Sequence, residues 1–161
     1  MIVHSDSAPN RSATLKEVCS ATIDKTKSIE PANVMVVRDA NSLQVKLLDF
    51  GLAHAHEAVQ RGEAAGTISY MAPELFEGKQ PSEAADMFAF GLIAYEVFAG
   101  QHPFDRGDDA ELVLALLGKE PDWTPLDDFP SLIELLGRLL SKSPLMRPSA
   151  AEALDSLAQA M

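Results

Sequence analysis

The sequence predicts a mainly α-helical protein that carries one small β-hairpin. Between residues 34 and 48, two short runs rich in Val and Leu flank a polar, turn-forming segment, which is the pattern of two paired strands. After Asp49 the apolar residues recur at helical spacing, and capping residues such as Ser82 and Ser149 precede several of these stretches. A chain of 161 residues has room for one domain of this kind.

The N-terminal part is expected to differ from the rest, so we divide the chain into an atypical segment over residues 1–28 and a domain over residues 29–161. Within the first segment, Thr14-Leu15-Lys16-Glu17 matches a capping box and predicts a short amphipathic helix over about residues 14–25. Strands are expected over residues 34–37 and 44–48, because residues 38–42 between them have turn chemistry.

Five helices are expected in the remainder. A short one begins at Pro73 and reaches Glu77, since proline is tolerated in a first helical turn. A long apolar helix follows the Ser82 cap, reaches Ala99 and is closed by Gly100. The first of the last three helices is expected to open at Asp108 or Asp109 and to run to Leu117, with Gly118 closing it. The other two are expected over 132–140 and after a cap at Ser149. Their apolar faces comprise Leu132, Leu135, Leu136, Leu139 and Leu140 in the first of these two helices, and Ala153, Leu154, Leu157 and Ala158 in the second.

Composition narrows the possible functions. Thirteen Lys and Arg against 24 Asp and Glu give a net charge of −11, which disfavours binding to nucleic acid and to anionic membranes. The single cysteine, Cys19, has no partner for an internal disulfide, and no secretory or membrane-spanning segment is visible. We therefore expect a cytoplasmic protein.

Four short motifs carry information about function. They are Lys46-Leu47-Leu48-Asp49-Phe50-Gly51 after a strand, Gly66-Thr67-Ile68-Ser69-Tyr70-Met71-Ala72-Pro73-Glu74 before a helix, Asp86-Met87-Phe88-Ala89-Phe90-Gly91 inside the long helix, and Arg147-Pro148 near the end. In this order and spacing they resemble the C-terminal lobe of a serine/threonine protein kinase of the type common in bacteria. Any one motif is weak, but four in register over most of the chain are specific.

The resemblance implies ATP and Mg²⁺ as cofactors and a protein as substrate or partner. Asp49, with Phe50 and Gly51, matches the family's metal-binding aspartate and its neighbours, and Asn33 matches the asparagine that holds a second Mg²⁺. Carboxylate and amide oxygens are ligands that suit Mg²⁺.

Other residues match the family's substrate site and scaffold. Thr67 resembles the threonine that shapes the serine/threonine substrate site. Glu74 and Arg147 resemble an ion pair that ties the activation segment to the last helices, and a guanidinium fork suits a partly buried carboxylate. Asp86 resembles the helix aspartate that accepts hydrogen bonds from the catalytic-loop backbone.

The catalytic loop departs from the family pattern of His-Arg-Asp-Leu-Lys-Pro-Glu/Ala-Asn. Counting back from Asn33 without a gap places Ser28 at the catalytic base and Glu30 at the lysine that neutralises the transferring phosphate. Serine does not accept a proton as a carboxylate does, and Glu30 brings charge of the wrong sign. In a second alignment His4-Ser5-Asp6 supplies the loop's first half. Asp6 is then the base, provided that residues 7–28 loop out.

Two further features argue against activity of these 161 residues alone. They contain no Gly-x-Gly, so no glycine-rich loop is present to cover ATP phosphates, and no nucleotide-binding lysine or glutamate partner is recognisable. Residues 52–65 contain no Ser, Thr or Tyr that loop phosphorylation would need. We therefore expect a kinase by family that is reduced to its C-terminal lobe and inactive by itself. The alternatives are a non-catalytic, pseudokinase-like interaction module and a lobe completed by a separate chain that bears the N-terminal lobe.

Overall fold

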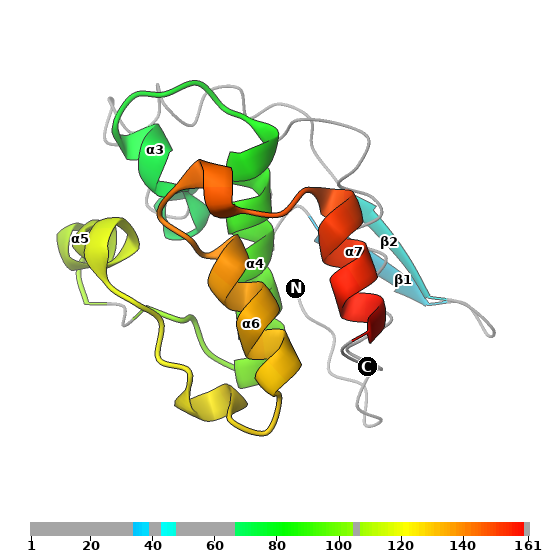
Figure 1. Ribbon diagram of the computed structural model, residues 1–161. Helices are drawn as coiled ribbons and strands as arrows, with labels where there is room; N and C mark the ends of the chain where they lie inside the picture. Colours follow the sequence, from blue (N-terminus) through cyan, green and yellow to red (C-terminus); the bar gives the residue numbers. More distant parts are fainter. Residues whose placement is uncertain (1–33, 39–42, 48–66, 105–106, 160–161) are drawn as a thin grey trace.

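The computed structural model describes residues 34–38, 43–47, 67–104 and 107–159. Within these ranges the chain forms one antiparallel hairpin followed by a group of helices (Figure 1). The sequence-predicted helix over 14–25 lies outside the described residues. None of the described helices combines the length and the apolar character needed to cross a membrane.

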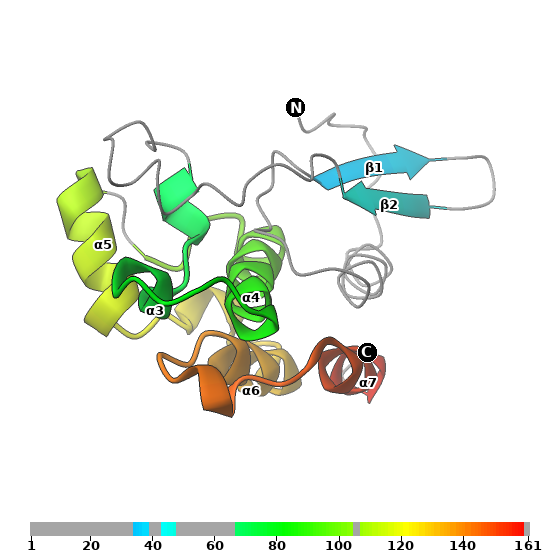
Figure 2. The same ribbon diagram turned by 90° about the horizontal axis from the view of Figure 1, so that it is seen from above.

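The hairpin pairs β1 (Val34–Arg38) with β2 (Leu43–Leu47). Its register places Val34 opposite Leu47 and Arg38 opposite Leu43. Both predicted strands are confirmed, and each reaches one residue further toward the turn than predicted, because Arg38 and Leu43 still pair across the ladder. In both views the hairpin lies on the opposite side of the central helix α4 from α5 (Figures 1 and 2).

The central helix is α4 (Glu83–Ala99), which is buried along most of its length. Ser82 caps its N-terminus, since the side chain of Ser82 accepts from the Ala85 N–H at 3.3 Å. Gly100 ends it in the left-handed conformation with φ of 76°, which glycine adopts without steric cost. Both predicted ends of this helix are confirmed.

The shorter helices surround α4. Before it lie the 3₁₀ turn η2 (Thr67–Tyr70) and the one-turn helix α3 (Pro73–Phe76). After it come α5 (Asp109–Gly118), α6 (Pro130–Leu139) and α7 (Ala150–Gln159), with the 3₁₀ turns η3 (Thr124–Leu126) and η4 (Pro144–Met146) between them. The helix order follows the prediction.

Several details of the prediction are wrong. Helix α6 begins two residues before the predicted start and ends one residue before the predicted end, and α3 ends at Phe76, one residue early. Gly118 is the last residue of α5 and does not close it. The cap is Lys119 in extended conformation, and Gly118 does not have the positive φ of a left-handed cap. Ala158 is exposed on α7, whose buried residues are Ala150, Ala153 and Leu157.

The core is packed against the two sides of α4. On one side Phe90, Tyr95 and neighbouring residues pack against α7 and the leucine face of α6. All five leucines predicted for that face are buried, but Leu140 follows α6 and belongs to the cluster on the other side. On the other side Phe88 and Leu92 pack against Phe104 and α5. Other elements cover α4 on both sides, and this explains why its apolar residues are not confined to one face.

Candidate functional site

The segment that carries the predicted substrate-site threonine is a compact turn in front of α3. Thr67 is the first residue of η2, and the turn is closed by a hydrogen bond of 3.1 Å from the Met71 N–H to the Ile68 carbonyl. Met71 and Ala72 are buried, and Pro73 starts α3 as predicted. The buried Met71 and Ala72 and the start of α3 therefore anchor this segment at its C-terminal side.

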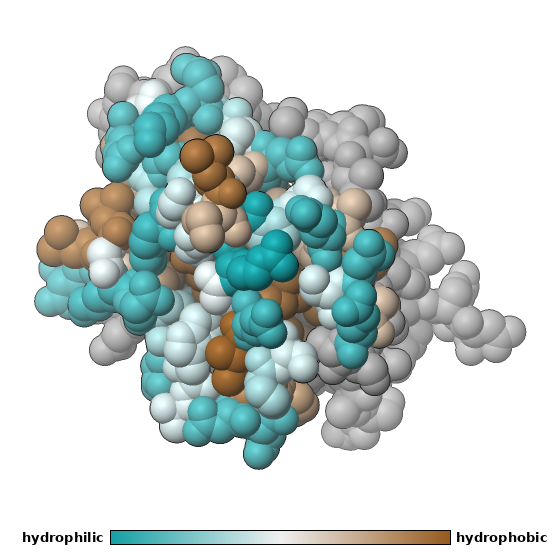
Figure 3. All heavy atoms as spheres, viewed as in Figure 1, coloured by the Kyte–Doolittle hydropathy of each residue, from teal (hydrophilic) through white to brown (hydrophobic). Residues whose placement is uncertain are grey.

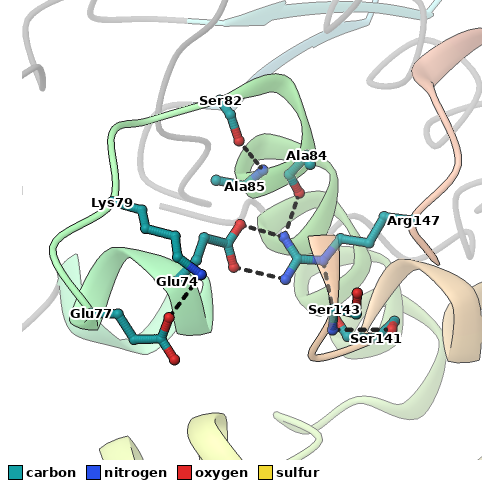
Figure 4. Close-up of polar contacts among 9 residues, drawn as sticks. All are labelled: Glu74, Glu77, Lys79, Ser82, Ala84, Ala85, Ser141, Ser143 and Arg147. Carbon is teal, nitrogen blue, oxygen red and sulfur yellow. Dashed lines mark hydrogen bonds and ion pairs between the residues drawn. The ribbon is translucent and has the colours of Figure 1, made fainter. Parts of the chain in front are cut away.

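A buried ion pair joins α3 to the segment before α7. The guanidinium of Arg147 donates from Nη1 to Oε1 of Glu74 at 2.6 Å and from Nη2 to Oε2 at 2.8 Å (Figure 4). The side chains of Arg147 and Glu74 are 0% and 4% exposed. Each terminal nitrogen donates to a different carboxylate oxygen, which is the fork geometry that favours arginine over lysine.

Arg147 also makes contacts beyond Glu74. Its Nη1 also donates to the Ala84 carbonyl at 2.8 Å, and its Nε donates to the Ser141 carbonyl at 2.9 Å. Its guanidinium carbon lies 4.8 Å from the centre of the Phe88 ring, in cation–π geometry. Arg147 thus holds α3, the first turn of α4 and the turn after α6 together (Figure 4).

Asp86 is 5% exposed in the first turn of α4. Its predicted partners belong to the catalytic loop, which lies outside the described residues. A buried carboxylate depends on hydrogen-bond donors from neighbouring segments. The burial of Asp86 therefore fits the predicted scaffold role, in which it accepts such bonds.

A second polar cluster connects η2 to the C-terminal end of α4. The hydroxyl of Tyr70 donates to Oε2 of Glu96 at 2.7 Å. Nε2 of His102 lies 3.0 Å from the Ser69 carbonyl oxygen, and the His102 ring meets the Tyr70 ring edge-on with centres 5.8 Å apart. The sequence analysis missed this cluster, because its members lie 26 and 33 residues apart and no local motif signals the pairing.

Lys142 is a half-buried lysine whose contacts the sequence analysis did not predict. Its Nζ donates to the Leu116 carbonyl at 2.9 Å and lies 4.4 Å from the centre of the Phe104 ring. Burial lowers the pKa of Lys142 to about 8, against an opposing contribution from Glu120. This lysine joins the turn after α6 to the Leu116 carbonyl in the last turn of α5.

The predicted metal-binding and catalytic residues lie outside the described ranges. They are Asp6, Asn33, Asp49, Phe50 and Gly51. Among the described residues no group of three or more His, Cys, Asp or Glu side chains is arranged to hold a metal ion. Of the predicted site residues, the described part of the chain contains Thr67, Glu74, Asp86 and Arg147, for which the sequence predicts substrate-side and scaffold roles.

A protein family and several curated proteins match most of this chain. The family described as "Protein kinase domain" matches residues 27–157. The chain is 33% identical over 121 residues to the serine/threonine-protein kinase PknA of Corynebacterium glutamicum, covering 73% of this chain and 25% of that protein. It is 37% identical over 125 residues to PknA of Mycobacterium tuberculosis, covering 75% of this chain and 28% of that protein. It is 32% identical over 148 residues to the serine/threonine-protein kinase pkn2 of Myxococcus xanthus, covering 83% of this chain and 18% of that protein.

The fold and the matched motifs thus define a helical kinase lobe. The chain belongs to the protein kinase domain family. It spans about a quarter of the length of the curated relatives it matches.

Proposed function

We propose that these residues form the substrate-side lobe of a serine/threonine protein kinase, whose family reaction moves the ATP γ-phosphoryl group to a protein hydroxyl. The observation that carries this proposal is the buried Glu74–Arg147 pair, which secures the helix directly after the Thr67 turn. Positioning a protein hydroxyl requires such a fixed segment, because phosphoryl transfer depends mainly on positioning and charge neutralisation.

In this proposal Thr67 shapes the substrate site, while Asn33 and Asp49 hold Mg²⁺. The donor set fits the ion, since amide and carboxylate oxygens are the ligands that Mg²⁺ prefers. Bound Mg²⁺ would neutralise charge on the ATP phosphates. Glu74, Asp86 and Arg147 act only on the scaffold.

We further propose that the 161-residue polypeptide transfers phosphate poorly by itself. Glu30 aligns with the family's phosphate-neutralising lysine and would bring charge of the wrong sign, and in the ungapped alignment Ser28 stands at the base position without a carboxylate. The same substitutions favour a second candidate function, a non-catalytic module that binds a protein partner. A separate chain bearing an N-terminal lobe is a partner consistent with either function. A cytoplasmic location, expected from the single cysteine, stays a proposal.

A fusion experiment separates the two candidate functions. A bacterial kinase N-terminal lobe is placed ahead of Met1, and transfer from labelled ATP to a generic protein substrate is measured. We expect transfer near background. Deleting residues 1–25 and replacing Thr26-Lys27-Ser28-Ile29-Glu30 with His-Arg-Asp-Leu-Lys should then raise transfer, since general-base positioning alone supplies about 10²–10⁴-fold.

Two control variants test which residues are responsible for any transfer that is measured. In the repaired fusion, Asp49→Asn should abolish the gain by weakening the Mg²⁺ site. A repaired fusion that stays inactive would favour the non-catalytic module. If the unrepaired fusion is already active and Asp6→Asn abolishes its activity, then Asp6 is the base and residues 7–28 loop out.

A further inference from the structure

We propose that His102 is a positioning residue that fixes the η2 turn and, through it, the candidate substrate-site residue Thr67. This inference rests on the proposed function for the substrate role of Thr67. The mechanical part, that His102 holds η2, rests on geometry alone.

The first step concerns the hydrogen on the His102 ring. Nε2 lies 3.0 Å from the carbonyl oxygen of Ser69, which follows Thr67 by two residues. A carbonyl oxygen only accepts, so Nε2 carries the hydrogen and donates it. The bond joins the loop after α4 to the backbone of η2 across 33 positions of sequence.

The second step concerns the other ring nitrogen. Nδ1 lies 3.3 Å from the Phe104 backbone nitrogen and 3.1 Å from the Phe104 carbonyl oxygen. In the neutral ring Nδ1 accepts from the Phe104 N–H, and in the protonated ring it donates to the Phe104 carbonyl. Either way Nε2 remains a donor toward Ser69, so Phe104 fixes the ring in the orientation that holds η2.

The third step is that the loop carrying His102 is itself anchored. Phe104 is 2% exposed in the core, and its ring lies beneath the ammonium of Lys142. Lys142 in turn donates to the Leu116 carbonyl at the end of α5. A continuous set of contacts therefore runs from the core to Ser69, and His102 makes the last contact in this set. Tyr70 supports the same turn through its bond to Glu96.

Two substitutions of His102 distinguish a positioning role from a general packing role. The amide nitrogen of glutamine can occupy the place of Nε2 and donate to Ser69, so His102→Gln retains the link. The shorter asparagine reaches only the place of Nδ1, so His102→Asn keeps a partner at Phe104 and loses Ser69. Both variants remove the ring, so they are matched in lost aromatic contact.

The test is amide hydrogen exchange of the full 161-residue chain, read by mass spectrometry over residues 67–72 and over α6. In His102→Asn we expect exchange over 67–72 to rise about two- to tenfold, the equilibrium worth of one hydrogen bond. In His102→Gln it should stay near the parent, and α6 should be unchanged in both. Unchanged exchange in His102→Asn, or an equal rise in both variants, would overturn the proposal.

Nitrogen NMR of the parent chain provides a measurement that needs no variant. The neutral imidazole should show its hydrogen on Nε2, and a hydrogen on Nδ1 alone would overturn the proposed link to Ser69. The exchange readout is independent of catalysis. A protected η2 in a repaired fusion that transfers no phosphate would therefore refute the kinase function while leaving the role of His102 intact. In an active repaired fusion, His102→Asn should raise KM for a protein substrate with less effect on kcat, and His102→Gln should restore it.

Discussion

Arg147 and Glu74 lie 73 positions apart in the sequence, yet they are joined by two parallel hydrogen bonds of 2.6 and 2.8 Å inside the protein. The pair fixes α3 against the turn that precedes α7. Because Arg147 also donates to two backbone carbonyls, no charge is left without hydrogen-bond partners at this point. A buried pair of this kind is costly to break, since the remaining charge stays in a medium that solvates it poorly.

The first prediction is that Arg147→Ala destabilises the domain by about 3–5 kcal/mol, because it leaves the Glu74 carboxylate buried without its partner. Arg147→Lys should also lower the Tm, because an ammonium does not reproduce the two-pronged contact. Thermal melts followed by circular dichroism measure both effects.

The matched control is the exposed pair of Lys79 and Glu77, whose atoms are 2.9 Å apart with side chains 61% and 59% exposed. Lys79→Ala should leave the Tm unchanged, because exposed pairs contribute little. Melts in which Arg147→Ala behaves like Lys79→Ala would contradict the assigned role of the buried pair.

Local sequence rules predicted much of this fold. Ser82 and Gly100 mark the ends of α4 because capping depends on neighbouring backbone groups, which a sequence motif records directly. The leucine face of α6 followed from periodicity alone. Gly118 misled the prediction because a glycine acts as a left-handed cap only when its φ is positive, and here Gly118 is instead the last residue of the helix.

Contacts between side chains were predicted only where the family resemblance pairs the two residues. The Glu74–Arg147 pairing came from the resemblance, whereas the bonds of His102 to Ser69 and of Tyr70 to Glu96 depend on how α4 packs against η2. Side chains of these types are common on any surface, so their identities alone indicate no partner. The predicted metal ligands Asn33 and Asp49 remain predictions.

The second prediction concerns the close approach of α4 and α6. A Cβ added at Gly91 would lie 2.9 Å from Cβ of Leu139 and 3.0 Å from Cδ2 of Leu140. Gly91→Ala should therefore destabilise the domain by about 1–3 kcal/mol through overpacking. Urea unfolding, with the slope m compared between variants, measures this change.

Gly137, on the exposed side of α6, provides the control, because an added Cβ there meets no atom within 4 Å. Gly137→Ala should stabilise by about 0.5–1 kcal/mol, since alanine loses less backbone freedom in a helix. If both alanine variants shift the unfolding midpoint in the same direction, the inferred helix contact is wrong.

The third prediction concerns pH. Burial lowers the pKa of Lys142 to about 8, below its ordinary value of 10.5. Below pH 8 this lysine is protonated in both the folded and the unfolded chain. Between pH 8 and 10.5 the unfolded chain binds more protons, so the contribution of Lys142 to stability rises with pH.

Replacing Lys142 with Met should remove this rise, which urea unfolding at several values between pH 8 and 10 would measure. The window stops there because burial raises the pKa of Tyr95, whose contribution to stability then falls as pH climbs above 10. Tyr95→Phe provides the control for that opposing group. Parent and Lys142→Met curves that run parallel over pH 8–10 would contradict the assignment.

The last prediction is that the 161-residue polypeptide binds ATP with Mg²⁺ weakly or not at all. Its sequence holds no Gly-x-Gly, so the backbone amides that would enclose the phosphates of the nucleotide are not supplied by these residues. Asn33 and Asp49 would contribute only through Mg²⁺, and Glu30 adds a repulsive charge. Isothermal titration should therefore give no saturable heat at micromolar nucleotide, with the repaired N-lobe fusion as the positive control. A micromolar Kd for the chain alone, equal to about −8 kcal/mol of binding, would require phosphate contacts that this sequence does not reveal and would refute the proposal.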